Sequence, residues 1–96
     1  YGSASPEEEA AYCLAVAERI HEVGGARGDE RLRKHLDEQI ALWRPRAGPL
    51  SLKGRIALAR DTSAPGVNEG AHLHLAVQDC AHRAVGFYGY RFAGFD

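Results

Sequence analysis

The sequence predicts a single α+β domain in which two N-terminal helices pack on an antiparallel meander sheet of three or four strands. Two observations predict this fold class. Apolar residues recur every three or four positions in the first half of the chain, and they alternate with polar residues in the second half. The chain has 96 residues, of which 45% are hydrophobic and 26% are charged. This length supports one small core, so residues 1–96 are expected to form one domain.

The first predicted helix begins near Ser5 and ends at the glycine pair of residues 24–25. Ser5 is a preferred N-cap residue, Pro6 suits the first helical position, and Glu8 lies three residues after the serine, as in a capping box. One apolar stripe runs along the helix: Ala10, Cys13, Val16, Ala17 and Ile20. The two glycines supply the backbone freedom with which helices often end.

The second predicted helix begins at Asp29, which follows Gly28 and has a side chain suited to an N-cap. Its buried face is formed by residues at helical spacing: Leu32, Leu36, Ile40 and Trp43. Pro45 disfavours helical backbone at Arg44, so the helix is expected to end there, with a turn over residues 45–49.

Three strands are predicted in the second half of the chain. In residues 50–58, leucine and isoleucine alternate with polar or small residues, and Gly54 interrupts the pattern as a bulge would. A polar turn over residues 61–70 leads to a second alternating segment at 72–78. A tight connection at 79–82 then leads to a third strand at 85–92, which is rich in aromatic residues.

The chain has two cysteines, Cys13 and Cys80. In a protein that matures outside the cytosol they would form a disulfide that closes a long loop and stabilises the fold by about 4 kcal/mol. In the cytosol they would instead be small buried apolar side chains. The chain contains no Met, which favours a secreted protein or a domain excised from a larger precursor, but the compartment stays open.

His72 and His74 are the candidate metal ligands. On a strand, residues two apart project from one face about 7 Å from each other, so both imidazoles could bind one divalent ion. A third or fourth ligand would come from Asp79, from His82 or from a residue on a neighbouring strand. The alternative is that both histidines are polar residues on the exposed side of a half-buried strand.

Residues 70–78, with the sequence GAHLHLAVQ, resemble the metal-binding strand of HUH-type replication endonucleases. The resemblance implies that His72 and His74 hold a divalent cation that polarises a DNA phosphate for attack by a tyrosine. Family members carry this tyrosine on a helix that usually follows the histidine strand, whereas Tyr88 and Tyr90 lie in a predicted strand here. The predicted layout also resembles that of barnase-like ribonuclease toxins, which implies phosphodiester cleavage without a metal.

Aromatic residues gather near the C-terminus: Phe87, Tyr88, Tyr90, Phe92 and Phe95. Of these, Tyr88, Tyr90 and Phe92 are the candidate partner surface. We therefore expect a small non-enzymatic binding module without a cofactor, which uses its sheet edge and aromatic strand to contact a protein partner or a second copy. The alternative is a phosphodiesterase or nuclease, either metal-dependent through the histidine pair or metal-free.

The charge balance bears on which partners are expected. The formal net charge is −1, which disfavours nucleic acid and anionic membrane surfaces as partners. No apolar run approaches the length of a transmembrane helix, so no membrane partner is expected.

Overall fold

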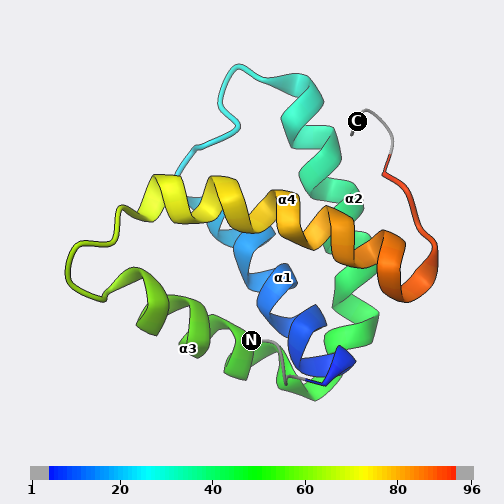
Figure 1. Cartoon of the computed structure of the whole chain (residues 1–96). Helices are drawn as coiled ribbons and strands as arrows, with labels where there is room; N and C mark the ends of the chain where they lie inside the picture. Colours follow the sequence, from blue (N-terminus) through cyan, green and yellow to red (C-terminus); the bar gives the residue numbers. More distant parts are fainter. Residues whose placement is uncertain (1–4, 93–96) are drawn as a thin grey trace.

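A computed structural model describes residues 5–92, and all regular secondary structure in this range is helical (Figure 1). The elements are, in order, α1 (Pro6–Glu22), α2 (Glu30–Ala47), the short 3₁₀ helix η1 (Gly48–Leu50), α3 (Ser51–Thr62) and α4 (Glu69–Tyr88). The predicted α+β class with an antiparallel meander sheet is therefore wrong, because residues 5–92 contain no strand.

Helix α1 is the centre of the fold and contacts α2, α3 and α4, the last of which crosses it (Figure 1). Its predicted capping box is confirmed: the Ser5 hydroxyl accepts from the N–H of Glu8 at 3.2 Å, and the Glu8 carboxylate accepts from the N–H of Ser5 at 3.1 Å. The hydrogen bond from the Ser5 backbone lowers the pKa of Glu8. Burial is continuous over residues 9–17, because three helices surround α1 and its alanines let them approach closely.

Helix α2 begins as predicted, since the Asp29 side chain accepts from the N–H of Leu32 at 3.0 Å. The predicted end at Arg44 is wrong, because the helix continues through Pro45 to Ala47. Proline removes one backbone donor, and here it does so on the exposed side of the helix. In the last turn the Arg46 guanidinium also donates to the carbonyl of Leu42 at 2.8 Å.

The strand predicted at residues 50–58 is instead the end of η1 followed by most of α3. Its alternating apolar residues include pairs four positions apart, so the pattern also fits a helix. Gly54 is not a bulge but the point where α3 crosses α1. A Cβ at this position would clash with the carbonyl of Ala11 and lie 2.9 Å from its Cβ, so only glycine lets the two helices meet this closely.

The strands predicted at residues 72–78 and 85–92, with the connection at 79–82, are replaced largely by the single helix α4. The side chain of Asn68 caps its start by accepting from the N–H of Ala71 at 2.9 Å. Buried residues recur along α4 at helical spacing: Leu73, Ala76, Val77, Cys80, Ala81 and Ala84. The strand prediction rested on the alternating leucine and valine residues alone. The alanines of this segment complete an apolar face at helical spacing.

Gly89 ends α4 in the left-handed conformation, with φ of 64°. The chain then returns along α2 (Figure 1). Phe92 is buried and stands edge-on to the ring of His35 in α2, with 5.1 Å between the ring centroids.

Contacts between buried side chains tie α4 to α1. Cys13 and Cys80 form a disulfide, with their Cα atoms 5.6 Å apart and both side chains fully buried. Of the two alternatives for the cysteines, the structure thus contains the disulfide rather than two buried thiols. One turn before Cys13, Glu9 is buried and its Oε2 lies 2.9 Å from Nη1 of Arg83.

Candidate functional site

The two histidines proposed as metal ligands lie on α4 rather than on a strand. Residues two apart on an α-helix project about 200° from each other, so the side chains diverge. His72 points to α1 and contacts Tyr12, whereas His74 lines a pocket between α2 and α4. Within residues 5–92, no group of three or more His, Cys, Asp or Glu side chains is arranged to hold a metal ion.

His72 instead belongs to a polar cluster that joins three helices. The hydroxyl of Tyr12 donates to Oδ2 of Asp61 at 2.7 Å and lies 2.8 Å from Nε2 of His72. Since the hydroxyl proton is directed to Asp61, the imidazole nitrogen donates to the phenol oxygen. Tyr12 and Asp61 also line a pocket of about 420 Å³, together with Lys53 and Arg60 of α3 and Glu8 and Glu9 of α1.

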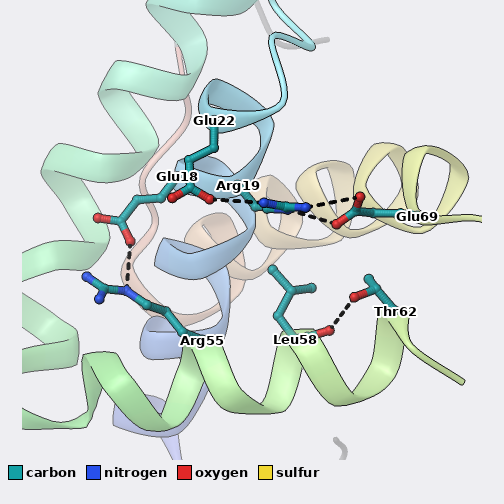
Figure 2. Close-up of polar contacts among 7 residues, drawn as sticks. All are labelled: Glu18, Arg19, Glu22, Arg55, Leu58, Thr62 and Glu69. Atoms are coloured by element: carbon teal, nitrogen blue, oxygen red, sulfur yellow. Dashed lines mark hydrogen bonds and ion pairs between the residues drawn. The ribbon is translucent and has the colours of Figure 1, made fainter.

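A second pocket, of about 530 Å³, lies between α1, α3 and the start of α4, and we call it the α1–α3 pocket. Its apolar lining consists of Ala15, Leu58 and Ala59. Charged residues surround this lining: Glu18, Arg19, Glu22, Arg55 and Glu69. Two hydroxyl residues complete the wall, Ser63 and Thr62, the second of which is drawn in Figure 2.

The charged residues of the α1–α3 pocket form ion pairs, as Figure 2 shows. Arg19 Nε lies 2.8 Å from Glu69 Oε2, and its Nη1 lies 3.4 Å from Glu22 Oε1. The hydrogen bonds with Glu69 raise the pKa of Arg19, and those from Arg19 lower the pKa of Glu69. On the other side, Glu18 Oε1 lies 3.6 Å from Arg55 Nε. The pair of Arg19 and Glu69 therefore favours the charged form of both groups.

The predicted partner surface is only partly exposed. Tyr88 and Tyr90 are 38% and 40% exposed, and Phe87 joins them at 48%. Phe92 is 2% exposed and belongs to the core. Phe95 lies outside the described residues. We define the aromatic surface as Phe87, Tyr88 and Tyr90.

The rings of the aromatic surface are held by their neighbours. Tyr88 packs against Trp43 with 6.1 Å between ring centroids, and the guanidinium carbon of Arg46 lies 4.5 Å from the Tyr88 ring centre. This is the distance of a cation–π contact. The hydroxyl of Tyr90 donates to Glu38 Oε2 at 3.4 Å.

Neither the α1–α3 pocket nor the cluster at Tyr12 was predicted from the sequence. Arg19 and Glu69 are 50 positions apart, and no local pattern indicates that they meet. The sequence did indicate one other buried polar side chain. Gln39 lies at helical spacing from Leu36 and Trp43, on the face of the helix that was predicted to be buried.

Comparison of the chain with protein-family models, with curated proteins and with solved structures gives no match. None of the helices within residues 5–92 has the length and apolar character needed to cross a membrane. The function is therefore inferred from the chemistry of the described side chains.

Proposed function

We propose that the protein is a non-enzymatic binding module that contacts a protein partner through the aromatic surface at the end of α4. The observation that supports this proposal is the exposure of three large aromatic side chains in one short stretch. Other aromatic residues of the described chain, such as Trp43 and Tyr12, are buried. The binding mode expected from the sequence, addition of a strand at a sheet edge, is not proposed, because residues 5–92 contain no strand.

The geometry of the aromatic surface suits a protein interface. Tyrosine and phenylalanine bury large areas on binding, and tyrosine can also form a hydrogen bond at the edge of the contact. Tyr88 is already restrained by Trp43 and Arg46, so its ring loses little conformational freedom when a partner covers it.

The charges beside the aromatic surface indicate the chemistry of the partner. Arg46 lies over Tyr88, and the exposed Arg91 follows Tyr90 in the chain. Arginine next to aromatic rings favours an acidic partner segment that also carries apolar side chains. Single-stranded nucleic acid would match the same residue types, but the net charge of −1 disfavours a polyanion.

Selection from a displayed random-peptide library tests this proposal. We expect the protein to enrich peptides that combine Asp or Glu with apolar residues, and the double variant Phe87→Ser/Tyr90→Ser to bind a selected peptide at least about tenfold more weakly. The matched control is Leu52→Ser/Ile56→Ser, which changes two apolar side chains of α3 that are also exposed.

Two outcomes would contradict the proposal. Equal weakening in both double variants would show that the aromatic surface is not the contact. Binding of a labelled single-stranded oligonucleotide that competes with the peptide, and that Phe87→Ser/Tyr90→Ser abolishes, would assign the surface to nucleic acid.

A second function, cleavage of a phosphodiester without a metal, has one observation in its favour. The carboxylate of Asp61, the phenol of Tyr12 and the imidazole of His72 form a hydrogen-bonded chain that can relay a proton. The neighbouring pocket contains Lys53 and Arg60, which could each contact a phosphate oxygen, beside the carboxylates of Glu8, Glu9 and Asp61.

Incubation with labelled single-stranded RNA and DNA in the presence of EDTA tests this second function. We expect any cleavage to be abolished by His72→Asn and retained by His74→Asn, since His74 lies away from the cluster. Unmodified substrate at micromolar protein would remove this function and leave the binding function in place.

A further inference from the structure

We propose that residues 89–92 form a pH-sensitive latch, which opens when His35 is protonated in acid and then withdraws Tyr90 from the aromatic surface. The latch regulates the site of the proposed function, so its effect on binding rests on that proposal. Its opening does not, because the opening is a change within the protein that needs no partner.

The latch is held against α2 by Phe92. This residue is 2% exposed and lies in the core cluster with Trp43, edge-on to the His35 ring with 5.1 Å between the centroids. The ring of Tyr90 packs on that of Phe92, with 4.9 Å between the centroids, and its hydroxyl donates to Glu38 Oε2 at 3.4 Å. The position of Tyr90 in the aromatic surface therefore depends on Phe92 being in place.

The hydrogen bonds around His35 accommodate only the neutral ring. Its Nε2 lies 2.9 Å from the side-chain nitrogen of Gln39, which is a donor. The Gln39 amide cannot turn its oxygen to His35, because that oxygen accepts from the indole of Trp43 and the nitrogen donates to the carbonyl of Val77. A protonated His35 would therefore point one N–H at another where Gln39 is fully buried and His35 is 9% exposed, which is costly.

Charged groups lie around His35, and their effects oppose each other. Burial, the larger effect, lowers the pKa of His35, and the negative charge of Glu38 on the same helix raises it. On the side of the latch, the Tyr90 hydroxyl is directed to Glu38. The pocket that His35 lines contains further titratable or charged side chains: Asp29, Arg31 and His74. Since burial outweighs Glu38, a proton favours a His35 ring that has left its buried position.

The direction of the pH effect follows from the two states of His35. When the ring leaves, Phe92 loses a surface against which it packs, and Gly89, with φ of 64°, serves as the hinge of the latch. In the open state His35 reaches water and its pKa returns to about 6.5. Below that pH the open state binds a proton that the closed state does not. The ratio of open to closed protein therefore rises by up to about tenfold per pH unit, until the pH reaches the lowered pKa of the closed state.

NMR of the free protein tests the opening. From about pH 7.5 down to about pH 4.5, we expect the ring signals of Phe92 and the indole N–H signal of Trp43 to change together with the imidazole signals of His35. Trp43 is the only tryptophan of the chain, so its indole signal needs no further assignment. The backbone signals of α1 and α3 should keep their folded positions over this range, because only the latch opens.

Two variants in the same pocket locate the proton. His35→Gln keeps a side-chain acceptor for Gln39 but binds no proton, so it is expected to hold Phe92 in place throughout the titration. His74→Gln makes the same change on α4, in the pocket that both histidines line, and is expected to leave the response of Phe92 unchanged.

The effect on binding is measured with a peptide selected at neutral pH. Its apparent affinity should fall in proportion to the closed fraction that NMR measures, because only the closed latch presents Tyr90. The same titration with His35→Gln corrects for protonation of the peptide itself. Absence of any peptide that binds at neutral pH would contradict the proposed function and the regulatory role, while the NMR titration would still decide whether the latch opens.

Four results would overturn the proposal. Titration of His35 with unchanged Phe92 signals would show that the ring leaves without opening the latch. The same Phe92 response in the wild type and in His35→Gln would place the proton elsewhere. Loss of the α1 and α3 signals together with those of Phe92 would show general unfolding. Constant peptide affinity while the latch opens would show that binding does not depend on it.

Discussion

The buried side-chain amide of Gln39 forms hydrogen bonds with an indole N–H, which can only donate, and with a backbone carbonyl, which can only accept. The indole N–H of Trp43 donates to its Oε1 at 2.9 Å, and its Nε2 donates to the carbonyl of Val77 at 3.0 Å. The amide orientation is therefore fixed. Its Nε2 also lies 2.9 Å from Nε2 of His35, so this histidine nitrogen must accept and the ring must be neutral.

We expect His35 to make the stability of the protein depend on pH. Burial lowers the pKa of His35, so below the ordinary histidine pKa of about 6.5 the unfolded chain binds more protons than the folded one. The free energy of unfolding should be fully retained above that pH and decrease as the pH falls from there towards the lowered pKa. Urea unfolding at several pH values measures this slope, which should be shallower in His35→Phe. The same slope in both proteins would contradict the assignment.

The hydroxyl of Tyr12 should contribute measurably to stability. Tyr12→Phe removes its hydrogen bonds to Asp61 and His72, and we expect a loss of about 1–2 kcal/mol in the free energy of unfolding. The control is Tyr90→Phe, which removes a surface hydrogen bond of 3.4 Å to Glu38 and should change stability by less than about 0.5 kcal/mol. Equal effects of the two substitutions would mean that the cluster at Tyr12 is no stronger than a surface contact.

At the scale of the helices, the crossing of α1 and α3 depends on Gly54, which has no side chain. Gly54→Ala should lower the free energy of unfolding by about 2–3 kcal/mol, because the new Cβ would meet the Ala11 carbonyl and force the helices apart. Gly86→Ala in α4 is the matched control, since no atom lies within 4 Å of the position of its Cβ. There the better helix propensity of alanine should stabilise the protein by up to about 1 kcal/mol. Thermal unfolding of both variants should therefore give shifts of opposite sign.

The starts of α1 and α2 could be predicted from the sequence because their signals are local. The caps at Ser5 and Asp29 each require only a side chain and a backbone N–H three residues away. The sheet was predicted wrongly because the apolar residues at 50–58 and 72–78 fit both a two-residue and a helical period. In α4 the decisive helical positions are alanines such as Ala76, which a search for large apolar side chains overlooks.

The candidate sites could be predicted less well, for a related reason. The pairing of Cys13 with Cys80 was within reach because the chain offers only one pairing. The ion pair of Arg19 with Glu69 depends on how α4 crosses α1, which no local pattern contains. The proposed convergence of His72 and His74 depended on strand geometry and disappeared when the segment proved helical.

For the whole molecule, the disulfide is expected to carry much of the stability. It closes a loop with a sequence separation of 67 residues between α1 and α4. Constraint of the unfolded chain by a loop of this length is worth about 4 kcal/mol. Urea unfolding with and without a phosphine reductant measures the difference, and mass spectrometry confirms reduction through a gain of about two daltons. A difference below about 1 kcal/mol would show that the helix contacts alone hold α4 in place.

The central position of α1 also has a consequence for biosynthesis. This helix is translated before the others described here. Its core cluster also contains Cys80, Ala81 and Ala84, which belong to α4, the last of the described helices to be translated. A nascent chain that has reached only α3 would still expose the side of α1 that α4 covers. The domain should therefore complete its folding only after nearly all of α4 has left the ribosome.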